Sequence, residues 1–179
     1  MKVLLFDTET TDLIANSLLA DNHQPRVIEF YGQVVDEETG EVMYRCEFRC
    51  NPGIPVPALI TKITGITTDD VKNEPPFRSF EKELRLLFSQ AGAAVAHNLK
   101  YDWQVLNMEF KRNGLAPLDW PPILICTVEE TEWFKGHRLK LQDLHSHLFG
   151  ENFADAHRAR NDVEALTRCW LRMKEQELV

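Results

Sequence analysis

An apolar run that leads directly into two carboxylates, near the start of the chain, constrains the fold most strongly. Residues 3–6 are Val, Leu, Leu and Phe, and Asp7 and Glu9 follow. Such a run is typical of a strand buried on both faces, in the middle of a sheet. Side chains alternate along a strand, so Asp7 and Glu9 should point to the same side. Because two close carboxylates repel each other, and because Mg²⁺ and Mn²⁺ prefer carboxylate oxygens, the pattern predicts part of a divalent-metal site.

Length, composition and charge restrict the class of protein. The chain has 179 residues and is 44% hydrophobic, from which we expect one globular domain over residues 1–179. No stretch resembles a signal peptide or a membrane span, so we expect a cytoplasmic protein without a membrane partner. The net charge of −8 disfavours a long nucleic-acid footprint but suits a protein that holds only a strand end through metal ions. The cysteines form no CxxC pair, which favours reduced thiols over zinc ligands: Cys46, Cys50, Cys126 and Cys169.

Strand and helix signals alternate along the rest of the chain. After a polar loop, two strands joined by a turn predict a hairpin, and two short apolar runs predict further buried strands; these strands are expected at 26–35, 41–49, 93–96 and 123–126. Helical patterns are expected at 68–71, 76–90, 101–113, 129–134, 139–149 and 159–175. A hairpin joined to strands that alternate with helices predicts an α/β fold, with a mixed central sheet and helices packed on it. Such a sheet binds ligands beyond the carboxyl ends of its strands.

Two further aspartates lie near the starts of predicted helices. Asp102 shares a helix face with Val105 and Leu106, and Asp162 begins an apolar stripe that continues at Leu166. A carboxylate on an inward helix face needs a partner. Taken singly, each aspartate is better explained as a helix N-terminal charge or a member of a salt bridge. Their appearance together with the two acids of the first strand favours a shared metal site.

His157 is the candidate general base. On a continuous helix, its separation from Asp162 would turn the two side chains about 140° apart. They converge only if His157 lies in the loop or first turn before the helix, with which residues 154–156 (Ala-Asp-Ala) are compatible. A histidine beside metal ions suits proton transfer near neutral pH. The alternative is an ordinary surface histidine at a helix start, as expected of the other histidines.

Three segments together resemble the exonuclease motifs of the DnaQ-like, or DEDDh, 3′–5′ exonucleases. They are DTETT at 7–11, HNLKYD at 97–102 and HRARND at 157–162. Two supporting segments are similar as well: ITGIT at 63–67 and LQDL at 141–144. The first motif is most similar to proofreading exonucleases of the DNA polymerase III epsilon type and to stand-alone DNA exonucleases. The resemblance covers nearly the whole chain and implies a ribonuclease H-like fold.

The resemblance also implies a set of site residues. Two Mg²⁺ ions, for which Mn²⁺ can substitute, would be held by Asp7, Glu9, Asp102 and Asp162, with His157 as the base. The terminal nucleotide would be received by Thr10, Leu13, Ile63, Thr64, Asn98 and Tyr101. Ordinary packing explains Ile63 equally well. Arg158 and Arg160 could touch phosphate, although solvated surface charges explain them better.

Two positions depart from the family pattern. Asp12 stands where the family usually has Gly, and its charge near a substrate phosphate could weaken binding. Since Asp tolerates left-handed backbone better than most residues, the turn can survive the change. Cys126 stands where many members have Asp, at a supportive position.

The expected function is metal-dependent hydrolysis of phosphodiester bonds from the 3′ end of DNA, at single-stranded or frayed ends, with release of 5′-mononucleotides. The expected partners are a nucleic acid with a free 3′ end and a separate DNA polymerase or repair protein. A 3′–5′ exoribonuclease of the same family is an alternative, as is a non-catalytic binding module, although no acid is lost. A phosphatase acting on small esters is a third alternative. A related nuclease with a Tyr base is disfavoured because His157 fits the five-residue spacing.

Overall fold

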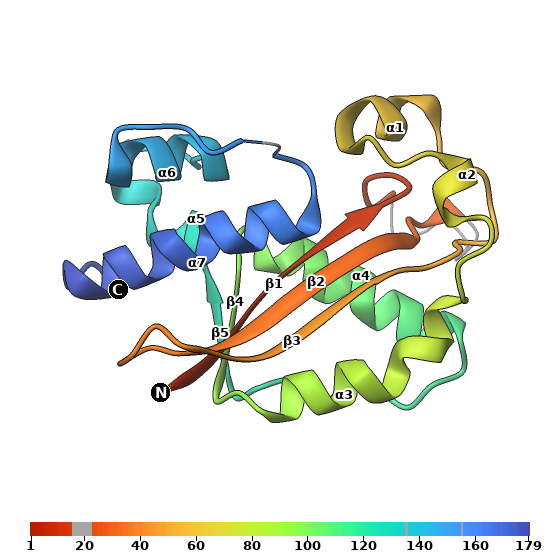
Figure 1. Ribbon diagram of the computed structural model, residues 1–179, viewed down its shortest axis with the longest axis horizontal. Helices are drawn as coiled ribbons and strands as arrows, with labels where there is room; N and C mark the ends of the chain where they lie inside the picture. Colours follow the sequence, from red (N-terminus) through yellow and green to blue (C-terminus); the bar gives the residue numbers. More distant parts are fainter. Residues whose placement is uncertain (16–22, 135, 155) are drawn as a thin grey trace.

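A five-stranded mixed sheet forms the centre of the molecule (Figure 1). The computed structural model describes residues 1–179 except 16–22, 135 and 155. The strands are β1 (Lys2–Thr10), β2 (Val27–Asp36), β3 (Val42–Arg49), β4 (Ala93–Ala96) and β5 (Ile123–Cys126), in the order β3-β2-β1-β4-β5. β1 pairs antiparallel with β2 and parallel with β4, so the central strand joins the hairpin to the parallel part. This arrangement confirms the predicted α/β fold with a mixed sheet and an antiparallel hairpin.

Helices cover both faces of the sheet (Figure 1). α3 (Glu81–Ser89) and α4 (Leu99–Arg112) lie on one face, and α6 (Leu141–Phe149) and α7 (Ala159–Glu175) lie on the other. The shorter helical segments are α1 (Ala58–Thr64), α2 (Thr68–Val71), η2 (Phe77–Phe80), α5 (Thr127–Glu130) and η3 (Glu132–Phe134). α1 and α2 lie beyond the carboxyl end of β1.

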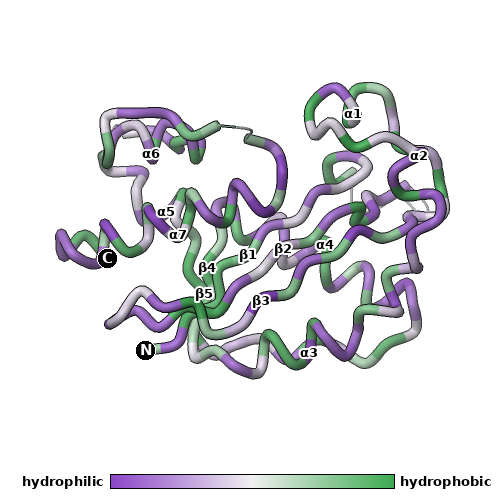
Figure 2. Tube along the Cα trace, in the orientation of Figure 1, coloured by the Kyte–Doolittle hydropathy of each residue, from purple (hydrophilic) through white to green (hydrophobic). Residues whose placement is uncertain are grey.

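The buried side chains of β1 alternate between two cores. Leu4 and Phe6 belong to the core formed with α3 and α4, whereas Val3 and Leu5 belong to the core formed with α6 and α7. A strand that is apolar at every position requires helices on both faces of its sheet, which is the arrangement observed. Figure 2 shows the centre of the sheet as largely hydrophobic. The same alternation places the acids at positions 7 and 9 on the side of α7.

Most element boundaries follow the predictions, with two instructive differences. The last helix spans Ala159–Glu175, as predicted. The segment predicted as one helix over 76–90 is divided into η2 and α3, because Phe80, the last residue of η2, departs from α-helical geometry with φ −100° and ψ 7°. α4 begins two residues earlier than predicted, at Leu99, directly after Asn98 in left-handed conformation.

The prediction of a fully buried strand at residues 123–126 was wrong. β5 lies at the edge of the sheet, where Ile123 is 45% exposed and Leu124 is 42% exposed. An apolar run indicates a strand but does not reveal whether both of its faces are covered. β5 is therefore an apolar edge strand rather than a central one.

Several smaller expectations concern the loop after β1, the cysteines and the membrane. Residues 12–15 are irregular, as predicted, and the rest of the expected loop at 16–22 lies outside the described residues. All four cysteines are free thiols, as predicted. Within the described part of the chain, no helix has the length and apolar character needed to cross a membrane.

Candidate active site

Three carboxylates converge where β1 ends. Asp7 and Glu9 come from β1, and Asp162 comes from the first turn of α7. One oxygen atom of each lies within 4.8 Å of the others, and this is the group of potential metal-ligating side chains found in the described part of the chain. The convergence follows from the packing of β1, since its odd-numbered residues face α7.

Asp102 approaches the same place from α4. It is only 2% exposed, and Val105 and Leu106 on the same helix face are fully buried. Its Oδ1 atom accepts hydrogen bonds from the backbone N of Thr8, at 3.1 Å, and from the Thr8 hydroxyl, at 2.7 Å. Thr8 lies between Asp7 and Glu9, so this hydrogen-bonded pair ties the fourth acid to the strand that carries the first two.

Burial and mutual repulsion disfavour the charged forms of these acids. Burial, followed by repulsion from Asp102 and Glu9, raises the pKa of Asp7 well above its ordinary value. Burial, followed by repulsion from Asp162, raises the pKa of Glu9 to about 8. Burial likewise raises the pKa of Asp102 to about 7 and that of Asp162 to about 6. These clustered carboxylate oxygens fit a divalent cation. Attraction between the cation and each carboxylate would outweigh the repulsion among the carboxylates.

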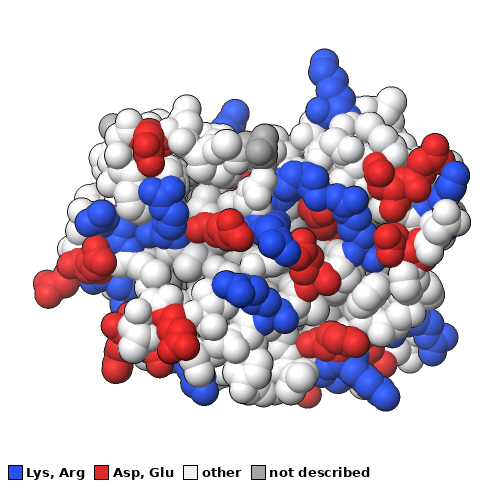
Figure 3. Space-filling view, in the orientation of Figure 1, with Lys and Arg blue, Asp and Glu red and all other residues white. Residues whose placement is uncertain are grey.

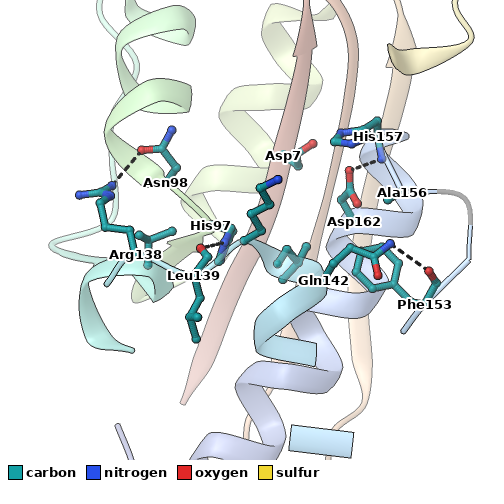
Figure 4. A pocket seen from close by; sticks show the side chains of 13 residues that line it. Asp7, His97, Asn98, Arg138, Leu139, Gln142, Phe153, Ala156, His157 and Asp162 are labelled. Carbon is teal, nitrogen blue, oxygen red and sulfur yellow. Dashed lines mark hydrogen bonds between the residues drawn. The ribbon is translucent and has the colours of Figure 1, made fainter. Parts of the chain in front are cut away.

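His157 lies in the segment before α7, as its proposed role requires. Its backbone is left-handed, with φ 68°, and its backbone N donates a hydrogen bond of 3.0 Å to Oδ2 of Asp162. The side chain is exposed and lines the same cavity as Asp7 and Asp162 (Figure 4). Since a non-glycine residue with positive φ is costly, the surrounding contacts must hold this turn in place.

Glu29 fixes the start of α7, and the sequence analysis missed it. It lies opposite Glu9 in the β1–β2 ladder and is 3% exposed. Its carboxylate accepts hydrogen bonds from Arg49 at 2.9 Å, from Arg158 at 2.9 Å and from the backbone N of Ala159 at 3.1 Å. Burial would raise the pKa of Glu29, but these hydrogen bonds outweigh it and hold the pKa below the ordinary value. A glutamate within the apolar run of β2 was the available signal, because such a residue needs buried partners.

A cavity of about 530 Å³ opens beside the acids (Figure 4). Asp7, Asp162 and His157 line one part of it. The remaining lining residues come from the segment after β4, α5, the segment before α6, α6 itself and the loop after it: His97, Asn98, Val128, Arg138, Leu139, Lys140, Leu141, Gln142, Phe153 and Ala156. Apart from Asn98, the predicted nucleotide-binding residues lie outside this cavity.

Those other predicted residues lie around the loop after β1 and on α1. The Tyr101 hydroxyl donates to the backbone O of Asp12 at 2.7 Å and is also hydrogen-bonded to the Thr10 hydroxyl. Leu13 is 75% exposed and Ile63 is 44% exposed, so both present apolar surface. Thr64 is buried. Its hydroxyl donates a hydrogen bond of 3.0 Å to the backbone O of Ile60 and accepts one of 3.1 Å from the backbone N of Ile66.

Asp12 does not adopt the left-handed conformation expected where the family usually has Gly. Among the described non-glycine residues, positive φ values occur at Asn98, His157 and Glu177. The Asp12 carboxylate instead accepts a hydrogen bond of 2.7 Å from the backbone N of Leu13. The turn therefore accommodates Asp without backbone strain.

Comparison with known proteins gives concordant results. Residues 4–169 match the model of the RNase_T family, described as exonuclease. The chain is 30% identical over 165 residues to a PolC-type DNA polymerase III of Streptococcus pneumoniae serotype 2, covering 92% of this chain and 10% of the relative. It is 32% identical over 165 residues to the PolC-type DNA polymerase III of Listeria welshimeri serovar 6b, covering 90% of this chain and 10% of the relative. The chain thus spans about a tenth of the length of these curated relatives.

Solved structures share the fold at lower identity. The nuclease domain of 3′hExo, described as a DEDDh family member bound to rAMP, has a TM-score of 0.77 at 18% identity, covering 98% of this chain and 92% of that chain. A structure of a 3′-exonuclease that recognises a histone mRNA stem-loop has a TM-score of 0.78 at 17% identity, covering 98% of this chain and 64% of that chain. These similarities confirm the predicted ribonuclease H-like fold.

The fold and the family match define a nuclease with a ribonuclease H-like fold. The family match covers most of the chain and includes all four acids. The chain therefore belongs to the exonuclease family, and its identification as a DnaQ-like (DEDDh) member is confirmed. Members of this family depend on divalent metal ions, and the acidic group is consistent with that dependence.

Proposed function

We propose that this chain is a two-metal-ion 3′–5′ exonuclease that removes 5′-mononucleotides from the 3′ end of DNA. The observation that carries the proposal is the convergence of Asp7, Glu9 and Asp162 within 4.8 Å, beside the buried Asp102 and the exposed His157. The packing of β1 against α7, and the hydrogen bonds of Thr8 to Asp102, bring together buried carboxylates that repel one another. A shared pair of cations would offset this repulsion.

The four acids are the proposed ligands of two Mg²⁺ ions, and Mn²⁺ should substitute because its ligand preference is similar. Asp7, Glu9 and Asp162 would hold the ions, and Asp102 would act on them directly or through water. When bound, such a pair supplies stabilisation of both the attacking and the leaving oxygen in phosphodiester hydrolysis. Thr8 holds Asp102 through two hydrogen bonds and so keeps the fourth acid beside the others.

His157 is the proposed general base that removes a proton from the attacking water. Its imidazole reaches the cavity from a segment that two contacts fix: its own backbone N binds Asp162, and Glu29 holds Arg158. An imidazole nitrogen can accept a proton, which matches this task. His157→Ala should therefore lower kcat much more than it changes KM. A change confined to KM would remove His157 from this role.

The terminal nucleotide is proposed to bind around the loop after β1. Leu13 and Ile63 present apolar surface to a base, and Tyr101 offers an aromatic ring for stacking. Thr10, Thr64 and Asn98 complete the proposed set, with Thr10 and Thr64 shaping the backbone through their hydroxyl bonds. None of these groups reads a base edge in an obvious way, so little sequence preference is expected.

The choice of DNA rests on the relatives. PolC-type DNA polymerase III proteins match at 30–32% identity, which also supports a polymerase or repair protein as partner. The solved neighbours bound to rAMP or recognising a histone mRNA stem-loop favour an exoribonuclease as the second candidate. A non-catalytic binding module is disfavoured because all four acids are present and grouped.

A panel of oligonucleotides tests the proposal. DNA and RNA decamers labelled at the 5′ end, single-stranded and as duplexes with frayed ends, are incubated with Mg²⁺, Mn²⁺ or EDTA. A 3′–5′ exonuclease gives a ladder that shortens from the 3′ end, requires metal, and is blocked by an inverted 3′-terminal nucleotide. Asp7→Ala should abolish the ladder while circular dichroism stays unchanged. Metal-independent cleavage, or digestion of the 3′-blocked strand, would contradict the proposal.

A further inference from the structure

Most cationic side chains near the acidic site already have carboxylate partners. Arg158 and Arg49 bind Glu29, and Arg160 binds Glu47. Figure 3 shows basic and acidic side chains lying next to one another across that face of the molecule. Arg158 and Arg160 would have to break these ion pairs before they could bind a phosphate. They are therefore poor candidates for holding a substrate strand.

Arg138 and Lys140 differ from those arginines. Both are exposed, and neither forms a salt bridge with a carboxylate in the described ranges of the chain. Both line the cavity that contains Asp7 and Asp162. The Arg138 guanidinium donates a long hydrogen bond, 3.4 Å, to the amide oxygen of Asn98 (Figure 4). Two cations thus remain available beside the acids of a chain whose net charge is −8.

The backbone between the two cations is fixed. Leu139 is 5% exposed, and its carbonyl O lies 3.0 Å from Nε2 of His97. Burial lowers the pKa of His97 to about 4, so the ring is neutral at pH 7 and can donate from Nε2 while Nδ1 faces the Thr127 hydroxyl at 2.9 Å. Leu139 is buried, whereas Arg138 and Lys140 on either side of it are exposed, and the backbone of Lys140 is extended. The segment therefore presents two cations at a defined place rather than on a loose loop.

We propose that Arg138 and Lys140 form a phosphate subsite for the strand that leads to the scissile bond, upstream of the terminal nucleotide. This inference rests on the proposed function. The residues proposed for the terminal nucleotide lie outside the cavity, with the exception of Asn98, so the cavity is free for the preceding nucleotides. The ligand is the sugar–phosphate backbone of a single strand, which an ammonium and a guanidinium bind without regard to sequence.

Dependence on substrate length tests the subsite. KM is measured for a dinucleotide and for a decamer, with wild type, with Arg138→Gln/Lys140→Gln and with the charge-retaining Arg138→Lys/Lys140→Arg. The control is Lys2→Gln/Lys82→Gln, which removes the same charge from exposed positions outside the cavity. Wild type should bind the decamer better than the dinucleotide. The glutamine pair should raise KM for the decamer by about tenfold, equivalent to ~1.4 kcal/mol. The charge-retaining pair should restore most of this loss.

Salt dependence provides the second measurement. Two lost phosphate contacts on a single strand should reduce the slope of log(kcat/KM) against log[salt] by about 1.4. An unchanged slope and an unchanged KM for the decamer in the glutamine pair, or an equal effect in the Lys2/Lys82 control, would overturn the subsite while leaving the exonuclease proposal standing. Failure of wild type to digest either substrate would instead overturn the proposed function and this inference with it.

Discussion

Replacing Asp7 by asparagine should stabilise the metal-free protein at alkaline pH. Asp7 lies at the centre of the acidic site, and its pKa is raised by burial and then by repulsion from Asp102 and Glu9. A carboxyl group whose pKa is raised in the folded state does not lower the free energy of unfolding at a pH below its ordinary pKa, because it is then protonated in both the folded and the unfolded state. The cost appears as the pH rises from the ordinary pKa through the raised one. Asparagine cannot ionise. Asp7→Asn therefore removes the destabilisation caused by ionising Asp7, and it also reduces the repulsion felt by the neighbouring acids.

The size of the effect follows from the neighbouring acids. For Glu9, a pKa of about 8 in place of 4.5 corresponds to a loss of about 4 kcal/mol in the free energy of unfolding at pH 8. Burial and Asp162 are the largest causes of this shift, and the repulsion between Glu9 and Asp7 instead contributes to the raised pKa of Asp7, after burial and Asp102. We therefore expect Asp7→Asn to raise the free energy of unfolding in EDTA by about 1–3 kcal/mol at pH 8 and by much less at pH 4. For a chain of this size, the gain corresponds to roughly 3–10 °C in Tm.

The assay is thermal unfolding followed by circular dichroism at pH 4, 6 and 8, in EDTA and in Mg²⁺. Wild type should gain stability from Mg²⁺ most strongly at pH 8, because the ion binds the folded site, and Asp7→Asn should gain less. Asp119→Asn is the matched control, since Asp119 is exposed and lies outside the acidic group. If wild type and Asp7→Asn showed the same dependence of Tm on pH in EDTA, the carboxylates would not repel one another as the structure indicates.

Three further substitutions test the surroundings of the acids. Glu29→Gln should lower kcat at least tenfold with little change in KM. It should also lower the free energy of unfolding in urea by about 2 kcal/mol, a value reduced because Arg49 and Arg158 are 31% and 40% exposed. An unchanged kcat would show that α7 is positioned without Glu29. Tyr101→Phe removes the hydroxyl that binds the Asp12 carbonyl, and should raise KM about threefold, equivalent to one ordinary hydrogen bond, with kcat retained in steady-state assays. Asp12→Asn keeps an acceptor for the backbone N of Leu13 but removes the charge. It should lower KM about twofold at low salt and less at high salt. A higher KM would contradict the idea that the Asp12 charge repels the substrate phosphate.

The convergence of Asp7, Glu9 and Asp162 could be predicted from the sequence because its signals are local. The apolar run of β1 requires burial on both faces, and the alternation along a strand then places Asp7 and Glu9 on one side. The helix faces of Asp102 and Asp162 were readable in the same way, through the apolar residues that share them. What the run at 123–126 could not reveal was its position in the sheet, since strand order depends on contacts between distant segments.

The pairing of charged side chains is the part that sequence could not supply. Arg158 and Arg160 adjoin His157, and the sequence favoured solvated surface charges over phosphate ligands for both. Instead, Glu29 and Glu47 from neighbouring strands bind them. Arg138 and Lys140 belong to no motif that was singled out. They reach the cavity because His97, at the end of β4, holds the carbonyl of Leu139. These contacts between distant residues decide which cations remain available to a substrate, and no local sequence pattern encodes them.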